Sequence, residues 1–459
     1  MRPRSALSNR ENTMANLPPR QMALVGFMQA SNVSVYAGSW LHPDSSPDFL
    51  SAGYYQHIGR VLEAGCFDML FFDDRLAMPG IFGNSVAETV RTGARCVKLD
   101  VSLTLAMIAA ATQHIGLGAT YSTTYYAPYH VARLFATLDH LSAGRAAWNV
   151  VTSVNDAEAQ NFGFQSHLGH DERYDQADEF LEVVTGLWEN WEDGAILWDQ
   201  PGRTFADPDR VHELHHHGQY YNVRGPLTVP RGPQGRPVLI QAGSSGRGQR
   251  FASRWADVVF TNTPDLDRAV ANYRDQKAQV AAAGRDPEQV RILPLTYLVV
   301  AETEAEARRE EQFLLDLVEP MASIVLLSEA TNLDFSGFEL DEPIPESFLD
   351  SATGMHGYVA GIKEYLGDRP VTLREMAGHR ATLRQSLRFV GTPGQVVDQM
   401  QAWFEAGACD GFVVAATSLP GTFETVTRLV VPELQRRGLF RTSYEGDTLR
   451  DHLSLVRPA

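Results

Sequence analysis

Uncharged hydrogen-bonding side chains gather at the ends of two neighbouring apolar segments. The first segment, 115–123, carries Thr120 near its end. The second segment, 145–153, ends in a run of amide and hydroxyl groups: Asn149, Thr152 and Ser153. Such groups suit a neutral, planar ligand that is rich in amide-like atoms. The alternative is ordinary strand propensity, because Thr and Tyr favour strands without binding anything.

A Gly/Ser turn, 242–248, follows another apolar run and leads into a helical pattern. Ser244, Ser245 and Arg247 stand where free N–H groups and the helix dipole favour an anion, so the turn is a candidate phosphate site. It matches neither GxxxxGK[ST] nor GxGxxG, and a Gly/Ser turn is often only a turn.

His170 and Tyr174, four residues apart at another helix start, share one helical face. There the alternative is helix capping by Asp171, with both rings simply packing.

Two adjacent acids, Asp73 and Asp74, end the apolar segment that begins at Phe67, and Arg75 follows them. Successive side chains on a strand point in opposite directions, so only one of the two carboxylates can face a site. The alternative is a pair of solvated or salt-bridged acids.

The run HELHH, from His212 to His216, has the HExxH spacing that holds zinc when it lies on a helix. Pro208 and Gly218 flank it, and no long amphipathic helix surrounds it, which favours a solvated loop or an edge strand. We therefore predict no metal site. No GxSxG elbow and no nucleophile–base pair are present, which is typical of enzymes whose cofactor carries the chemistry.

Eight apolar runs of strand length alternate with helical patterns and are continuous rather than alternating in polarity, as in parallel strands covered on both faces. They predict an α/β fold. Among α/β folds, eight strands with intervening helices favour a (β/α)₈ TIM barrel over an open doubly wound sheet. We expect a flexible N-terminal tail (1–20), one barrel (21–437) with insertions at about 75–101, 192–235 and 320–392, and a C-terminal extension (438–459). The runs begin at Gln21, Phe67, Ile115, Arg145, Pro237, Ala256, Val290 and Gly411.

Composition excludes several classes of protein. The 459 residues hold 39 basic and 56 acidic side chains, a net charge of −17, which argues against nucleic acid and anionic membrane surfaces as partners. Cys66, Cys96 and Cys409 are far apart, which excludes a disulfide scaffold and indicates a cytoplasmic protein. No apolar run is long enough to span a membrane, and the first residues lack the apolar core of a signal peptide, with Met14 as an alternative start.

Several long segments, in order, resemble the bacterial-luciferase-like flavin monooxygenases, in the subfamily of nitrilotriacetate monooxygenase component A, dibenzothiophene-sulfone monooxygenase and the pristinamycin synthase large subunit. The resemblance covers nearly everything from Gln21 to Leu453. It implies reduced FMN from a separate NAD(P)H:flavin reductase, and insertion of one atom of O₂ into a small substrate through a C4a-(hydro)peroxyflavin. The segments include FDMLFFDDRLA, TTYYAPYHVARLFATLDHLSAGRAAWNVVTS, HDERYDQADEFLEVVTGLW and PVLIQAGSSGRG.

The resemblance also implies roles for matching residues. It places FMN contacts on Asp74, Thr120, Thr152, Ser153, His170, Tyr174 and Ser244, with Ser245 and Arg247 assisting at the phosphate. Relatives usually carry a small residue or Pro before the strand-two acid, where this chain has Asp73. That acid is either an extra charge near the substrate or half of an outward-facing Asp73–Arg75 pair of small energetic weight.

The substrate is the least determined part of the function. Aromatic residues near strand ends (Phe27, Trp40, Tyr125 and Tyr129) favour an apolar or aromatic substrate, or else they merely pack the barrel. The alternatives to a monooxygenase are an F420-dependent oxidoreductase of the same superfamily, a non-catalytic flavin-binding barrel, and a metallohydrolase at the HELHH run. Relatives imply a homodimer or homotetramer.

Overall fold

Eight parallel strands close into a ring at the centre of the computed structural model, which describes residues 20–243, 245–352, 354, 370–381 and 386–458. Each strand pairs with the next, β10 pairs with β11, and β15 joins β11 to β1, so that no open edge remains in the ring. The predicted TIM barrel is thereby confirmed. In ring order the strands are β1 (Ala23–Gln29), β2 (Met69–Asp73), β3 (Gly116–Ser122), β4 (Ala146–Val151), β9 (Val238–Gln241), β10 (Val258–Thr261), β11 (Arg291–Val300) and β15 (Gly411–Ala415).

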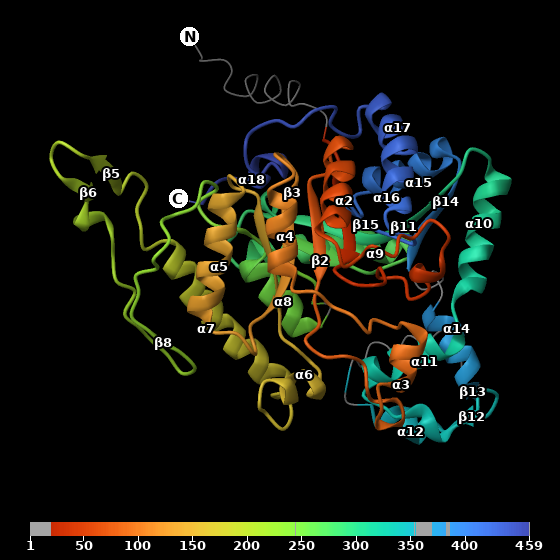
Figure 1. The fold of residues 1–459 in the computed structure, drawn as a ribbon. Coiled ribbons are helices and arrows are strands. Elements are labelled where there is room, and N and C mark those ends of the chain that lie inside the picture. Colours follow the sequence, from red (N-terminus) through yellow and green to blue (C-terminus); the bar gives the residue numbers. More distant parts are fainter. Residues whose placement is uncertain (1–19, 244, 353, 355–369, 382–385, 459) are drawn as a thin grey trace, which may run out of the picture.

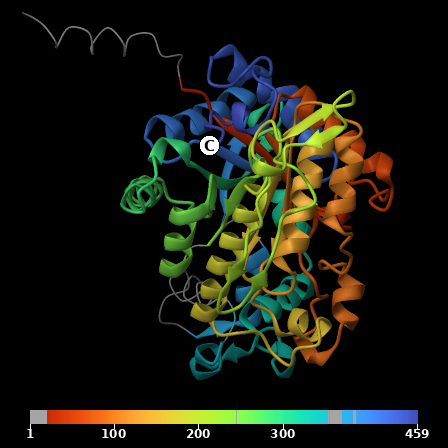
Figure 2. The same ribbon diagram turned by 90° about the vertical axis from the view of Figure 1, so that its left-hand side faces the viewer.

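Helices cover the outside of the ring (Figures 1 and 2). Many begin at a side chain that accepts a hydrogen bond from the first turn, such as Ser51, Asp100 and Ser245, so the chain enters each helix at a defined residue. The covering helices are α2 (Ala52–Ala64), α4 (Val101–Ala109), α5 (Pro128–Leu141), α7 (His170–Trp188), α8 (Gly246–Trp255), α9 (Leu266–Ala282), α10 (Glu304–Leu317), α15 (Pro393–Glu405), α16 (Gly421–Leu429) and α17 (Val431–Arg436).

The amino-terminal end of the barrel is closed by the end of the chain. Leu449, on the short helix α18 (Leu449–His452), packs with Leu453 and Leu455 among the inward-facing residues of the strands. Arg450 donates to Asp257 over 2.8 Å, and both side chains are buried. Within the predicted extension 438–459, residues 449–455 therefore form the floor of the barrel.

A ninth parallel strand lies outside the ring. β14 (Leu387–Gly391) pairs with the second half of β11, from Thr296 to Val300, beyond the point where β11 pairs with β15. The sequence analysis did not predict this strand, because it lies inside the stretch 320–392 of mixed composition.

The insertions 75–101 and 320–392 form one layer at the carboxyl ends of the strands (Figure 1), which we call the mouth layer. Its main helix α11 is buried along its whole length from Ala322 onward and packs on α3 and α14. The layer consists of α3 (Ala87–Thr92), α11 (Pro320–Thr331), α12 (Glu346–Asp350), α14 (Leu373–Ala381) and the short pair β12 (Pro343–Ile344) and β13 (Val371–Thr372).

The insertion 192–235 holds two small antiparallel pairs. β5 (Ile196–Asp199) and β6 (Thr204–Ala206) form a hairpin that projects away from the barrel (Figure 1), and β7 (His216–His217) pairs with β8 (Asn222–Val223).

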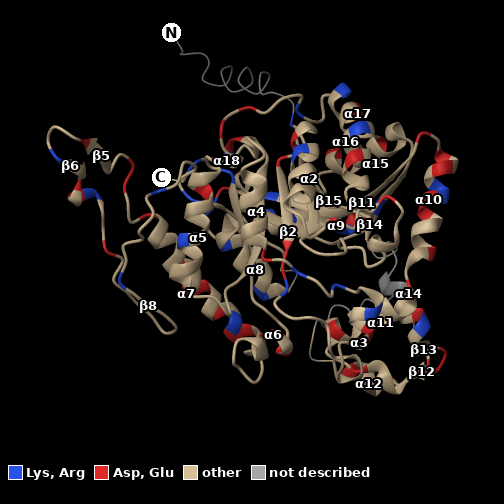
Figure 3. Ribbon diagram, in the orientation of Figure 1, with Lys and Arg blue, Asp and Glu red and all other residues tan. Residues whose placement is uncertain are grey.

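Acidic and basic residues are interspersed over the ribbon in Figure 3, with no continuous basic face in that view. Among the described helices, none is both long and apolar enough to pass through a lipid bilayer.

Candidate active site

Four inward-facing side chains form a polar layer at the carboxyl end of the barrel, which we call the mouth. On β1 and β2 the inward positions are apolar up to Phe27 and Phe71, and the next inward positions are Gln29 and Asp73. Gln29 Nε2 donates to Asp73 Oδ2 over 3.0 Å. The barrel therefore changes from an apolar core to hydrogen-bonding groups within one layer.

The neighbouring strands continue this polar layer. Thr120 on β3 stands opposite Asn149 on β4, and Asn149 Nδ2 donates to Thr120 Oγ1 over 2.9 Å. The amide nitrogens of Gln29 and Asn149 are thus bonded. Their amide oxygens, Gln29 Oε1 and Asn149 Oδ1, are buried and accept no hydrogen bond from the part of the chain that the structure describes. Buried acceptors are costly without a donor, so this pair fits a ligand that presents N–H groups.

Hydroxyl groups line the same side of the mouth. Ser122 Oγ and Ser153 Oγ lie 2.9 Å apart, and Thr124 Oγ1 accepts from the Ser153 amide over 3.2 Å. Thr152, directly after β4, is partly exposed. The structure thus brings together the hydroxyl residues predicted at the ends of these two strands.

The two acids at the end of β2 have different surroundings. Asp73 Oδ1 accepts from Lys98 Nζ over 2.7 Å, while Arg75 lies 3.5 Å from Glu329. The proposed outward-facing Asp73–Arg75 pair is therefore wrong, because Lys98, which is 25 positions away in sequence, is the counter-ion of Asp73. Burial raises the pKa of Asp74 to about 7, although the nearby Lys98 cation opposes the shift.

The phosphate site proposed from sequence lies at the start of α8. Ser245 is the N-cap, and its Oγ accepts from the Gly248 amide over 3.1 Å. The same oxygen lies 3.4 Å from His170 Nε2 at the start of α7. Ser244 lies outside the described residues. Two helix starts thus meet at one point, where the positive ends of both helix dipoles favour an anion.

Tyr174 and two glycines form a cradle beside this turn. A Cβ atom on Gly243 would lie 2.9 Å from Tyr174 Oη, and one on Gly248 would lie 2.7 Å from it. Gly243 would also place its Cβ atom 2.6 Å from Gln241 Nε2. Neither position has room for a side chain, because Tyr174 and Gln241 fill the space beside them. Ser245, His170 and the positive ends of the two helix dipoles favour an anion here, which fits a phosphate-bearing cofactor.

Arg247 is held by α7. Its Nη2 donates to Asp175 over 2.9 Å and to Asp178 over 2.6 Å, and its guanidinium lies 5.4 Å from the centre of the Tyr174 ring. His170 Nδ1 pairs with Asp171 over 2.7 Å, and α7 starts at Gly169 without a side-chain cap. Asp171 therefore orients His170 and does not cap the helix.

Comparison with known proteins places this site in a family. The model of the family described as "Luciferase-like monooxygenase" matches residues 33–410. Dibenzothiophene-sulfone monooxygenase of Rhodococcus erythropolis is 47% identical over 449 residues, which is 96% of this chain and 98% of the relative. Nitrilotriacetate monooxygenase component A of Aminobacter aminovorans is 40% identical and covers 96% and 97% of the two chains. The chain belongs to the luciferase-like monooxygenase family.

Solved structures support the same assignment. Long-chain alkane monooxygenase superposes with a TM-score of 0.85 at 32% identity, covering 95% of each chain. A riboflavin lyase solved with modified FMN and riboflavin gives a TM-score of 0.82 at 30% identity, over 94% of this chain and 95% of that one. Two F420-dependent enzymes match at 15% and 13% identity, which shows the shared fold alone. The predicted class, a monooxygenase, is confirmed over the F420-dependent and non-catalytic alternatives.

The aromatic residues predicted at the substrate site of this luciferase-like monooxygenase do not form one wall. Phe27 lies in the mouth, 5.1 Å from Phe71 between ring centres. Tyr125 stacks on Phe162 at 4.9 Å, Tyr129 is on α5 and packs against the outer core, and Trp40 donates to the carbonyl of Thr92. Of the four, Phe27 alone faces the barrel interior.

The HELHH run of the monooxygenase is not helical. His212 pairs with Glu192, whereas His216, on strand β7, pairs with Glu179. Glu213 pairs with Arg224 and with His215. The described residues contain no cluster of three His, Cys, Asp or Glu side chains with metal-binding geometry.

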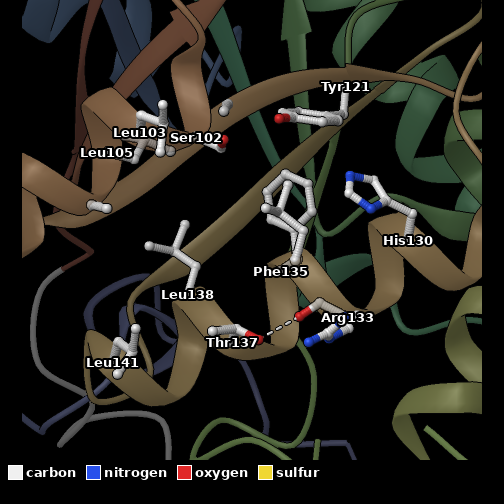
Figure 4. Close-up of a pocket in the computed structure, with 13 residues that line it drawn as sticks. Ser102, Leu103, Leu105, Tyr121, His130, Arg133, Phe135, Thr137, Leu138 and Leu141 are labelled. Carbon is white, nitrogen blue, oxygen red and sulfur yellow. Dashed lines mark hydrogen bonds between the residues drawn. The ribbon is translucent and has the colours of Figure 1, made fainter. Parts of the chain in front are cut away.

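An apolar groove of about 290 Å³ lies on the outside of the barrel, between α4 and α5 (Figure 4). Leu103, Leu138 and Leu141 line it together with Tyr121 and Phe135. Leu103 and Leu141 are 67% and 77% exposed. The groove is separate from the mouth and from the phosphate site.

Residues that the sequence analysis did not assign to the site are Gln29, Lys98, Gly243 and Gly248. The alternation of β1 could have placed Gln29 inward, two residues after Phe27. Nothing local in the sequence connects Lys98 with Asp73.

Proposed function

We propose that the chain is the oxygenase component of a two-component system that uses reduced FMN and O₂. The observation that carries the proposal is the cradle of Gly243, Ser245 and Gly248, closed by His170 and Tyr174 at two helix starts. Reduced FMN supplies, when bound, the two electrons that let one oxygen atom of O₂ enter the substrate while the other leaves as water.

Each side chain then has a defined task. Ser244 and Ser245 would hold the phosphate of FMN, with His170 and Tyr174 beside its ribityl–phosphate part. Arg247 keeps α7 and α8 together through Asp175 and Asp178 and so positions Tyr174. Asp74, Thr120, Thr152 and Ser153 would flank the isoalloxazine at the mouth.

The protein's own share of catalysis is positioning and exclusion of water. The mouth layer covers the carboxyl ends of the strands, and the amide group of Leu76, in the insertion 75–101, donates to Glu158 over 3.0 Å. An active site shielded in this way protects a reactive cofactor from water before the substrate reacts.

The partners follow from the relatives. One relative is named component A of a nitrilotriacetate monooxygenase, which supports an NAD(P)H:flavin reductase as the source of reduced FMN. The 47% identity with a dibenzothiophene-sulfone monooxygenase supports a small organic sulfone or related aromatic compound as substrate. All three cysteines are free thiols, in keeping with the cytoplasm.

We further propose that the chain forms a homodimer or homotetramer through the groove between α4 and α5. The groove is apolar, and its exposed leucines lie together on one face of the molecule. Covering them with a second copy would remove that surface from water.

The proposed function is tested by product formation. The protein, a flavin reductase, NADH, FMN and O₂ are incubated with sulfones, heteroaromatic compounds and aminocarboxylates, and the oxygenated product is measured, because NADH consumption also reports futile peroxide formation. Ser244→Ala and Tyr174→Phe are expected to weaken binding of reduced FMN. Unchanged affinity in both variants would refute the phosphate placement, and turnover with reduced F420 in the absence of O₂ would refute the oxygenase.

A further inference from the structure

An ion pair between Asp73 and Lys98 stands at the mouth of the barrel. Asp73 is the last residue of β2 and follows Phe71 on the inward face of the strand. Lys98 Nζ lies 2.7 Å from its carboxylate. The lysine arrives from the insertion 75–101, whose end is fixed to β1 by a hydrogen bond from the Leu99 amide to the Ala30 carbonyl.

The two charges are compensated locally. Both oxygens of Asp73 are occupied, one by Lys98 and the other by Gln29. The side chains of Lys98 and Asp73 are 11% and 24% exposed, so both face the mouth without being fully solvated. A partly buried pair of this kind interacts through a lower effective dielectric than water provides, so removing either partner leaves a charge that a ligand nearby will sense.

Aromatic rings lie directly below the pair. Phe71 stands 5.1 Å from Phe27 and 5.0 Å from Phe260, measured between ring centres. Phe27 and Phe260 are partly exposed, whereas the residues deeper in the barrel are buried. The mouth thus offers a base of aromatic rings and, at its β1–β2 side, an ion pair with no net charge of its own.

We propose that the Asp73–Lys98 pair is a specificity determinant that favours an uncharged aromatic substrate over a charged one. This inference rests on the proposed function, because it assigns the substrate class of the same site. A carboxylate or an ammonium group on the substrate loses its hydration on entering the mouth and gains no net attraction from a pair without net charge. A neutral ring system loses little hydration there.

Four proteins test the idea, and they differ in the charge at the mouth. Wild type and the double variant Asp73→Asn/Lys98→Met carry no net charge at the pair, Asp73→Asn alone carries +1, and Lys98→Met alone carries −1. The probes are diphenyl sulfone and its derivatives with one carboxylate or one methylammonium group. Their dissociation constants are measured by calorimetry on the full chain without flavin at pH 6, where Asp74, with a pKa of about 7, is mostly neutral.

In wild type and in the double variant we expect the neutral probe to bind most tightly. In Asp73→Asn the carboxylate probe should gain about tenfold relative to the neutral one, and in Lys98→Met the ammonium probe should gain about tenfold. Should Lys98→Met fail to fold, Asp73→Asn and the double variant still allow a comparison of a net charge of +1 with a net charge of zero at the pair.

The inference is overturned if the preference among the three probes is the same in all folded variants, or if each single variant weakens all probes equally and the double variant does not restore binding. Either result would leave the pair a purely structural element.

Titration with oxidised FMN, followed by flavin fluorescence, separates the two proposals. A protein that does not bind FMN but follows the charge pattern refutes the proposed function alone, whereas an FMN-binding oxygenase without the pattern refutes this inference alone.

Discussion

The hydroxyl of Tyr174 occupies the space that a side chain on Gly248 would need, since a Cβ atom there would lie 2.7 Å from it. Tyr174 has little freedom to retreat, because its ring is buried and stands 5.5 Å from Phe251. The first turn of α8 and the side chain from α7 are therefore fitted to each other, and a group bound at this turn depends on both.

Gly248→Ala is accordingly expected to displace Tyr174 and to weaken FMN binding at least tenfold, with a cost in stability of about 1–3 kcal/mol. Gly246→Ala, on the same turn, is the matched control, because its Cβ atom would meet only the end of Arg250 at 3.8 Å. Flavin fluorescence titration and thermal unfolding measure both effects. Equal FMN affinities in the two variants would contradict the cradle.

Arg247→Met removes two charge-assisted hydrogen bonds to α7, those to Asp175 and Asp178. We expect a loss of about 1–3 kcal/mol in the free energy of unfolding and weaker FMN binding, because α7 carries Tyr174. The exposed Arg250, on the same helix, provides the control Arg250→Met. If the two variants unfold at the same urea concentration, Arg247 does not hold the helices together.

His452 makes the barrel floor sensitive to acid. Burial and the nearby Arg441 lower its pKa to about 4. The imidazole of His452 is protonated near pH 6.5 in the unfolded chain but only near pH 4 in the folded chain. The stability that the neutral ring contributes is therefore complete above pH 6.5. It falls by up to about 3 kcal/mol as the pH drops towards 4. His452→Phe should lose less stability between pH 7 and pH 4.5 in urea titrations. A parallel loss in both proteins would assign the acid sensitivity to other groups.

The groove between α4 and α5 predicts a change in assembly. Leu103→Glu combined with Leu141→Glu places two charges on its rim, and we expect the molar mass from light scattering to fall to that of fewer copies. Leu50→Glu is the control, because Leu50 is also 67% exposed but lies before α2. An unchanged mass in the double variant would show that copies associate elsewhere or not at all.

The eight barrel strands could be predicted because each is a continuous apolar run between helical patterns. β14 was missed because its five residues, with Arg388 among them, lack such a run and gain their place only by pairing with the long strand β11. The hairpin of β5 and β6 was missed for a related reason, since all four residues of β5 are exposed and leave no burial pattern.

The candidate site residues that could be predicted from sequence are those that stand at helix starts and strand ends. Ser245, His170 and Tyr174 lie together as those positions require. Lys98 could not be placed, because its contact with Asp73 depends on the path of residues 93–100, which follow α3 and belong to no helix or strand. The interior role of the last residues was also hidden, because Leu449, Leu453 and Leu455 are scattered among polar neighbours and no strand periodicity marks them.

The floor made by Leu449, Leu453 and Leu455 sets an order of events during synthesis. These residues are translated after every strand of the ring, so the ring can close around its full apolar interior only once the ribosome has passed them. Until then the inner faces of the strands remain without part of their packing. A nascent chain of this protein would therefore present apolar surface to chaperones until the last stage of translation.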